Sequence, residues 1–345
     1  MAKKGSTLTA DRVIDFVMNN KSIFLLLFMV ILAQSFSSGL FLRPGNISTI
    51  FRQCAIPIVI ALGYTYNLTA GSLDLSVGHI ISLCCVVYND VVRGGRGVDE
   101  YAQVVETPGM FILALVTTLA VGVLCGFINA FMINKFSLVP FILTMGTGQI
   151  YRSIAMVMCG GVSYTVRFSS MKYIGQGFVF GLVPFSLVIF FVLTIVAAII
   201  MYRTKFGRNI VATGGNMEAA RVSGVPIVKT KIFATMIMGF HLAVAAIILT
   251  GRVAVAQPGG GTGMEMDAIA SVVIGGTLLS GGKPNVIGAV FGALIIASIS
   301  NMMNLLGVDA YLQWAVKGVI IIIAIALDNL SVRIMHSRML RASNV

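Results

Sequence analysis

Residues 108–132, PGMFILALVTTLAVGVLCGFINAFM, form 25 consecutive positions without a charged side chain. About 20 apolar residues in an α-helix are enough to cross the hydrocarbon core of a bilayer. A second uncharged run covers the 19 residues 184–202. A soluble protein with a large apolar core would not contain charge-free runs of this length, so the two stretches indicate a membrane protein with several spans.

The composition of the whole chain agrees with a membrane location. Of its 345 residues, 57% are hydrophobic and only 10% are charged, whereas soluble domains carry roughly 25% charged residues. The net charge of +12 does not indicate nucleic-acid binding, because the basic residues cluster at the edges of the apolar stretches, where they set orientation. The five cysteines lack metal-ligand spacing and are expected to behave as small hydrophobic residues.

Ten apolar stretches are interpreted as membrane spans. They cover residues 22–42, 49–68, 74–92, 108–132, 139–158, 184–202, 232–251, 266–282, 286–306 and 310–328. The third begins at an acidic residue and the eighth lies next to one, and both are rich in Gly or Ser, so either could be short, broken or re-entrant. The predicted fold is an all-α membrane domain over 22–328, between a cytoplasmic N-terminal segment, 1–21, and a basic cytoplasmic tail, 329–345.

The distribution of positive charge predicts the orientation of these spans. With the N-terminus inside, 15 of the 24 basic residues fall on the cytoplasmic side, including six in the loop 203–231. Lys and Arg are enriched in cytoplasmic loops. We therefore expect both termini in the cytoplasm, which an even number of spans allows.

The two halves of the chain resemble each other weakly. SLDLSVG (72–78) and EMDAIAS (265–271) both open a span, and NAFMINKFSLVPFILTMGTG (129–148) parallels NMMNLLGVDAYLQWAVKG (301–318). Five spans per half is an odd number, so the two copies must face opposite ways across the membrane. Inverted repeats of this kind recur in transporters, with the pathway near the midplane. The sequence thus predicts an inverted repeat of two five-helix halves.

A polar segment, GGNMEAARVSGVPIVKTK at 214–231, interrupts the apolar stretches and contains a short predicted helix. Asn216 is a suitable N-cap, Glu218 favours the positive end of the helix, and Arg221 lies one turn later on the same face. Gly224 is a natural stop, and Pro226 prevents continuation. Because two turns are well below the roughly 12–15 residues that an isolated helix needs, other contacts must stabilise this one.

Those contacts could come from the ends of the chain's own spans or from a cleft in a separate protein. Small side chains at Ala219 and Ala220 would let another backbone approach closely, and Val222 and Val225 offer modest apolar contact. The helix pattern alone leaves both alternatives open.

The segment GGNMEAARVSGV resembles the cytoplasmic coupling motif of ABC-transporter permeases. Nearly all of residues 22–330 resembles the permease family of ribose-, galactose-, xylose- and arabinose-type importers. The matching stretches are LDLSVGHIISL (73–83), TKFGRNIVATGGNMEAARVSGV (204–225), MEMDAIASVVIGGTLLSGGK (264–283) and NLLGVDAYLQWAVKGVIII (304–322). The external loop 93–109 and His79 depart from the pattern we expect of the family and leave the identity of the sugar open.

The resemblance implies a permease subunit in the cytoplasmic (inner) membrane of a bacterium. It implies a second permease, identical or homologous, one or two ABC ATP-binding subunits, an external sugar-binding protein and contact with lipid. ATP and Mg²⁺ would then bind to the partner ATPase, and no cofactor to this chain. The implied ATPase-coupling residues are Gly215, Asn216, Glu218, Ala219, Ala220, Arg221 and Gly224.

No catalytic motif indicates an enzyme. A phosphate-binding loop of the form GxxxxGK[ST] is absent from the sequence, and the nearest stretch, TLLSGGKP (277–284), has Thr277 for the first Gly and Pro284 for the magnesium-binding hydroxyl. The sequence also lacks a nucleophile elbow, HExxH and a plausible carboxylate pair. We expect no catalytic residue and no metal site in this chain.

Polar residues within or beside the spans mark a candidate pathway, because burying them in lipid is costly. Asp74 and Asp267 open matching spans and are expected to act as helix N-caps, with a solute-facing role as the alternative. Lys317, ~10 Å into the last span, could snorkel outward or face the bundle interior. The amides are expected chiefly to hold helices together, and Glu265 lies in an external loop. These further candidates are Asn129, Glu265, Asn301, Asn304 and Gln313.

The pattern favours an ABC importer permease for a neutral monosaccharide. The alternative, an ion-gradient-driven secondary transporter of a small neutral solute, needs titratable or cation-binding groups near the midplane. The acidic residues lie at span ends instead, and His241 alone is central, where a hydrogen bond between helices is the expected role.

Overall fold

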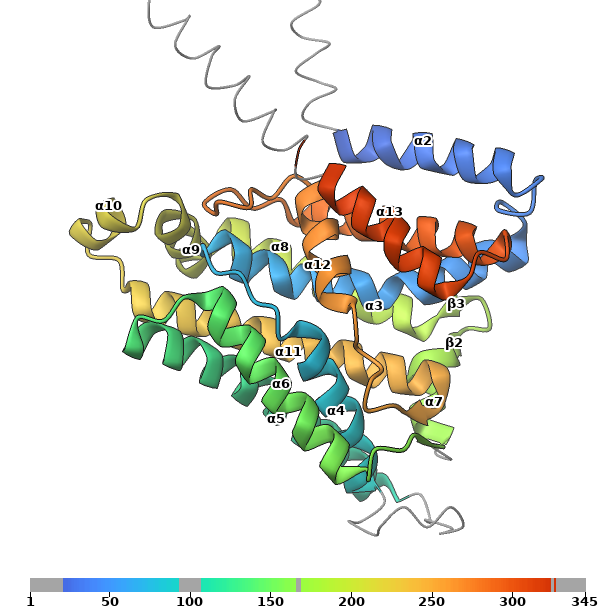
Figure 1. The fold of residues 1–345 in the computed structure, drawn as a ribbon, viewed down its shortest axis with the longest axis horizontal. Helices are drawn as coiled ribbons and strands as arrows, with labels where there is room; N and C mark the ends of the chain where they lie inside the picture. Colours follow the sequence, from blue (N-terminus) through green and yellow to red (C-terminus); the bar gives the residue numbers. More distant parts are fainter. Residues whose placement is uncertain (1–20, 93–106, 166–168, 324–325, 327–345) are drawn as a thin grey trace, which may run out of the picture.

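The computed structural model describes residues 21–92, 107–165, 169–323 and 326, and these residues are mostly helical. Within them, five helices are long and apolar enough to cross a membrane (Figure 1). They are α3 (Pro44–Thr69), α5 (Pro108–Phe136), α8 (Phe185–Arg203), α11 (Ile227–Val253) and α13 (Val286–Leu305). The predicted helical class is confirmed.

Shorter or less apolar helices occupy the other predicted spans. They are α2 (Lys21–Phe36), α4 (Val77–Val92), α6 (Pro140–Met158), α12 (Met264–Ile274) and a helix at Ala310–Ile323. Each of the ten predicted spans therefore contains a helix. By length and composition, five of these helices are long and apolar enough to cross a membrane. The terminal segments 1–20 and 329–345, and most of the external loop 93–109, lie outside the described residues.

The connection between α6 and α8 is more structured than the sequence indicated. α7 (Ser169–Gln176) packs against α8 and α11. Two short antiparallel pairs flank it, β1 (Tyr164–Thr165) with β4 (Val255–Ala256) and β2 (Phe178–Val179) with β3 (Val183–Pro184). These elements lie at the end of the bundle where α11 ends. We call it the outer end, after the orientation that the positive charges predict.

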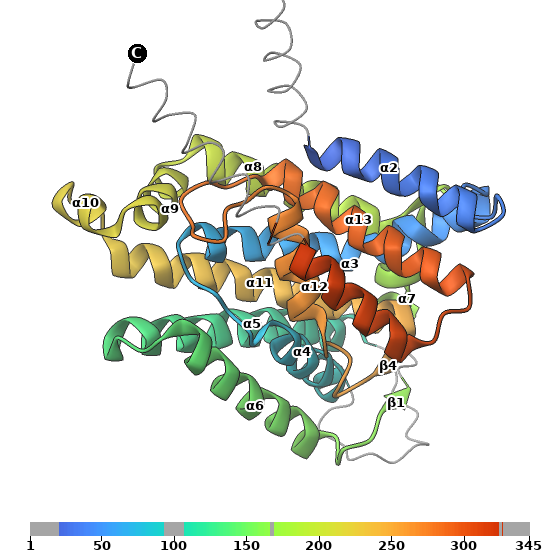
Figure 2. The same ribbon diagram turned by 45° about the horizontal axis from the view of Figure 1, so that its top comes forward.

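Helices α3 and α11 form the centre of the bundle (Figures 1 and 2). Apart from Pro57, every residue of α3 from Cys54 to Thr69 is buried. α3 lies against α8, α12 and α13, whereas α11 lies against α4, α5 and α7, and the two central helices also contact each other. The core is thus organised around two adjacent spans, one from each half of the sequence.

The peripheral helices turn apolar side chains outward. Ile142 and Val157 of α6 are 66% and 83% exposed, and Ile195 of α8 is 58% exposed. In water such a surface would cost about 25 cal/mol per Å², but lipid tails are as apolar as leucine. The outward faces therefore agree with lipid contact.

Glycines let two pairs of helices approach to backbone contact. Gly122 of α5 lies against the carbonyl group of Gly239 in α11, and Gly292 of α13 lies against the carbonyl group of Ser271 in α12. A side chain at either glycine would overlap the opposing backbone, so the small residues permit the contact. The GAVFG stretch at 288–292 is thus used within the bundle, one of the two alternatives open from sequence.

The third and eighth predicted spans are short helices entered through irregular backbone. α3 ends at Thr69, and α4 begins only at Val77 after a largely buried, non-helical segment, 70–76. α12 covers 264–274, so the remainder of the eighth predicted span, 275–282, is not helical. The start of α4 and the loop before α12 meet, because the Gly261 N–H donates to Ser82 Oγ at 3.1 Å. Both segments are therefore broken, as their Gly-rich and Ser-rich openings indicated.

Candidate functional site

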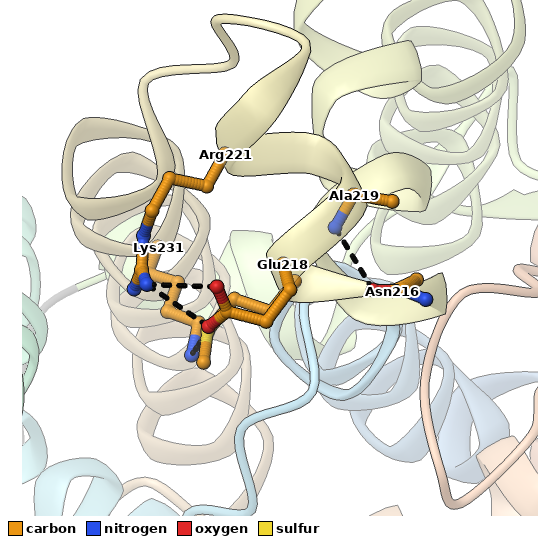
Figure 3. Close-up of polar contacts among 6 residues, drawn as sticks. Asn216, Glu218, Ala219, Arg221 and Lys231 are labelled. Atoms are coloured by element: carbon orange, nitrogen blue, oxygen red, sulfur yellow. Dashed lines mark hydrogen bonds and ion pairs between the residues drawn. The ribbon is translucent and has the colours of Figure 1, made fainter.

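The polar segment that follows α8 folds into two consecutive short helices. The Thr204 hydroxyl accepts a hydrogen bond from the Gly207 N–H at 3.1 Å and caps α9 (Lys205–Gly215). Asn216 ends α9 and caps α10 (Met217–Val222), its side chain accepting from the Ala219 N–H at 3.0 Å (Figure 3). The predicted Asn216 cap is confirmed, whereas helix α9 was not predicted.

The predicted pairing of charges on α10 is also present. The Arg221 guanidinium donates to both carboxylate oxygens of Glu218, at 2.9 and 3.0 Å (Figure 3). Their side chains remain 61% and 71% exposed, respectively, so this pair contributes little to stability. Gly224 has a φ of +77°, the left-handed conformation that ends a helix.

α10 projects from the end of the bundle opposite the outer end (Figures 1 and 2). Only Ala220 of α10 is buried, and Val222 is 89% exposed. A cavity of about 540 Å³ lies beside α10, between the turn into α11 and the α5–α6 corner, with Ile133, Leu138, Met217 and Pro226 among its lining residues. The exposed face of α10 is therefore not covered by any span in the described part of the chain.

Behind α10, three backbone segments meet at glycines, and we call this contact the glycine junction. It joins Gly214 at the end of α9, Thr69 at the end of α3, and Gly282 in the loop between α12 and α13. The Gly282 N–H donates to the Thr69 carbonyl at 2.9 Å, and the Gly214 Cα faces the same carbonyl without room for a side chain. The junction connects the end of α9 with the end of α3 and with the loop after α12, which adjoin the two broken spans.

Of the pathway candidates, Asp74 and Asn129 lie together in a fully buried network. Asp74 Oδ1 accepts from the Ser76 N–H at 2.7 Å and from Ser76 Oγ at 2.6 Å. The Asn129 amide donates to Asp74 Oδ2 at 3.2 Å, and the Tyr151 hydroxyl donates to Asn129 Oδ1 at 2.9 Å. The prediction that Asp74 caps α4 is wrong, because α4 begins three residues later; its side chain fixes the segment before the helix instead.

Asp267 and Lys317 form an ion pair in the second half. Lys317 Nζ lies 2.8 Å from Asp267 Oδ2, and each side chain is 21% exposed. Lys317 therefore faces the bundle rather than snorkelling outward. The predicted capping role of Asp267 is wrong, because Gly263 is the N-cap of α12 and Asp267 lies in its first turn.

The remaining candidates mostly join helices, as expected for amides. Asn301 and Asn46 exchange two hydrogen bonds, at 2.9 and 3.0 Å, and Gln313 Nε2 donates to Asn304 Oδ1 at 2.9 Å. Glu265 extends toward Gly78 at the start of α4. Asn304 also shares a cavity lining with Asp267, whereas Asn301 contacts Asn46 of α3.

A cavity of about 230 Å³ lies between α3, α11, α12 and α13, near the Asp267–Lys317 pair. Its polar lining residues include two predicted candidates, Asp267 and Asn304. It also includes Gln53, Arg252 and Ser300, which sequence reasoning missed. Arg252 carried a usable signal, as a charged residue at the end of an otherwise uncharged span.

The cysteines and the possible metal ligands show no reactive arrangement in the described part of the chain. All five cysteines are buried and unpaired, and among the described residues no group of three His, Cys, Asp or Glu side chains could hold a metal ion. His241 Nδ1 lies 2.8 Å from the Ile237 carbonyl of its own helix, so the expected bond between helices is not the one observed.

We expect the Asp267–Lys317 pair to stabilise the contact between α12 and the helix at 310–323. Lys317→Met leaves a partly buried carboxylate without its partner and should destabilise the purified chain by about 1–3 kcal/mol. The double variant Asp267→Asn/Lys317→Met should lose less unfolding free energy than the sum of the losses in Asp267→Asn and Lys317→Met, by ~0.5–3 kcal/mol. Thermal unfolding of all four proteins in detergent measures this, and strictly additive losses would contradict a direct interaction.

Comparisons with known proteins place this architecture among transport permeases. A family model described as "Branched-chain amino acid transport system / permease component" matches residues 46–325. The ribose import permease protein RbsC of Bacillus subtilis is 35% identical over 316 residues, covering 91% of this chain and 94% of that relative. The D-allose transport system permease protein AlsC of Escherichia coli is 34% identical over 308 residues, covering 89% and 90%.

A third relative extends the coverage further. The galactose/methyl galactoside import permease protein MglC of Haemophilus influenzae is 31% identical over 335 residues, covering 94% of this chain and 98% of that protein. No solved structure gives a significant match.

Proposed function

The chain belongs to the transport-system permease family whose model spans residues 46–325, and from that premise we propose that it is the membrane subunit of an ABC importer for a simple sugar. It is a multi-pass membrane protein. The observation that carries the proposal is the near full-length similarity to import permeases for ribose, allose and galactose. The ion-gradient alternative is not favoured by these relatives.

The architecture that we propose is an inverted repeat of two five-helix halves in a bacterial inner membrane, with both termini in the cytoplasm. The contact pattern supports it, because α5 packs against α4 and α11, and α13 packs against α12 and α3. These two sets correspond if α3, α4 and α5 match α11, α12 and α13. Each set contains one broken span, as in other inverted-repeat transporters.

In this proposal, α10 is the element that contacts an ATP-binding subunit. Its residues Glu218, Ala219 and Arg221 point away from the chain's own core, and Asn216 and Gly224 define its two ends. The backbone of Gly215 lies against Gly282 of the glycine junction, and Ala220 is the buried residue of α10. ATP and Mg²⁺ would bind to the partner subunits, and a second permease would complete the membrane part.

The glycine junction supplies a route from α10 to the pathway. Movement of α10 on closure of the ATP-binding subunits would be transmitted through Gly214 to the ends of α3 and of the α12–α13 loop. Because those segments carry the broken spans, their displacement would open the pathway inward for a sugar delivered by an external binding protein. The pathway candidates Asp74, Asn129, Glu265, Asp267, Asn301, Asn304, Gln313 and Lys317 belong to those spans or to their neighbours.

The experiment that tests this function is a mild-detergent purification of the tagged chain from its host membranes, followed by mass spectrometry. We expect an ATP-binding subunit to remain bound, and to be lost when 216–224 is scrambled. Scrambling the same number of residues at 169–177, in and just after α7 at the outer end, is the matched control and should leave that subunit bound. Recovery of the chain alone, with uptake driven by an ion gradient, would contradict the proposal.

A further inference from the structure

The cavity between α3, α11, α12 and α13 has the composition of a binding site for a small polar molecule. Its volume of about 230 Å³ is below the ~300–1,000 Å³ of pockets that take drug-sized ligands. It lies in the outer half of the bundle, because it is lined by the last turn of α11 and by the last three turns of α13. The cavity is therefore suited to one ring-sized solute on the outer side of the glycine junction.

Several polar side chains that line the cavity have hydrogen-bonding capacity to spare. In the described part of the chain, the side chains of Gln53, Arg252 and Ser300 are not hydrogen-bonded to any other residue, and no carboxylate lies within 4.0 Å of Arg252. Asp267 uses Oδ2 for Lys317, and Asn304 uses only its carbonyl oxygen, for Gln313. The side chains of Gln53, Arg252 and Ser300 are partly exposed, so they are available to a solute or water in the cavity.

The walls between these groups are apolar. Ile56, Pro57 and Ile60 of α3 face Ile296 and Ala297 of α13 across the cavity. A monosaccharide ring has C–H faces that suit such walls and a rim of hydroxyls that donate and accept hydrogen bonds. Small-molecule sites commonly combine apolar walls with a few placed polar groups in this way.

We propose that this cavity binds one neutral monosaccharide in the pathway, with Gln53, Arg252, Ser300 and Asn304 as the residues that read its hydroxyl pattern. Lys317 neutralises Asp267, whose second oxygen accepts a further hydroxyl. The inference rests on the proposed function, since it assigns a specificity site to the same pathway. A pathway that makes no specific contact with the sugar would have no such site. Occupancy of this cavity can be measured, so the two cases can be told apart.

The experiment uses Met264→Cys as a reporter, at a partly buried apolar position in the cavity lining, in the intact transporter, complete with its partner subunits. The five native cysteines are buried, so the new thiol should be the main site of reaction with a small water-soluble methanethiosulfonate. Ribose, allose, galactose and gluconate are first tested for uptake, and each is then tested for protection of the thiol. We expect the transported neutral sugar to slow labelling several-fold.

The matched control is Ser163→Cys, an exposed position directly before β1 at the same outer end of the bundle. Its labelling should not change with sugar. Adding Gln53→Leu to the reporter should raise the sugar concentration for half protection about fivefold, as loss of one hydrogen bond predicts.

The outcomes separate the two proposals. Uptake of a neutral sugar with unchanged Met264→Cys labelling, or a thiol that never reacts, would overturn the binding site and leave the importer intact. Protection by gluconate alone would overturn a neutral ligand. If uptake of the neutral sugars continues without ATP and follows an ion gradient, the proposed function fails and the binding site fails with it.

Discussion

Gly214→Ala should abolish sugar-stimulated ATP hydrolysis and lower uptake at least about tenfold, because it disrupts the glycine junction. A methyl group at Gly214 would overlap the carbonyl oxygen of Thr69 and lie 2.7 Å from the backbone nitrogen of Gly282. Both neighbours are backbone atoms, so no side-chain rotation relieves the overlap. Overpacking of this kind costs about 1–3 kcal/mol, and ~1.4 kcal/mol changes an equilibrium tenfold.

The matched control is Gly146→Ala in α6, a helical glycine where, apart from the adjacent backbone of its own helix, no described atom lies within 4 Å of the added methyl group. Both variants are purified with the ATP-binding subunit, and its retention shows that α10 is still folded and docked. We expect Gly214→Ala to keep that subunit and lose stimulation, and Gly146→Ala to behave as wild type. Normal stimulation in Gly214→Ala would show that motion does not pass through the junction.

The sequence was sufficient for the long helices and for α10, because each carries a local signal. A run such as 108–132 has one stable state in lipid, a helix that satisfies its own backbone hydrogen bonds. The Asn216 cap, the Glu218–Arg221 pair and the Gly224 stop act within two turns, so their residue types predict their contacts.

Features that depend on distant partners could not be predicted in the same way. The residues of the glycine junction lie up to 213 positions apart, between Thr69 and Gly282, and nothing near Gly214 distinguishes it from other glycines. The same reason explains the failed capping prediction for Asp74, whose carboxylate is held partly by Asn129 from another helix. The cavity between α3, α11, α12 and α13 forms only where these four helices come together. Gln53 and Ser300 could therefore not be assigned to its lining from the sequence.

Reversing the charge of Glu218 should uncouple the transporter without damaging the chain itself. Glu218 and Arg221 are both mostly exposed, and a helix pair of this spacing contributes only about 0.2–0.5 kcal/mol. Glu218→Arg also places a cation near the positive end of α10, at a cost of about 0.3–1 kcal/mol. Neither loss would unfold a bundle of this size, so a large functional effect must come from the docked partner.

Three variants separate these contributions. Glu218→Gln removes the ion pair but adds no repulsion, and it should lower sugar-stimulated ATP hydrolysis only a few-fold. Glu218→Arg should abolish it, because like charges brought together at an interface cost several kcal/mol. Lys172→Glu is the control, an exposed charge reversal on α7 at the outer end, and should leave coupling unchanged. Equal membrane levels of all three proteins with full stimulation in Glu218→Arg would mean that α10 does not dock through this face.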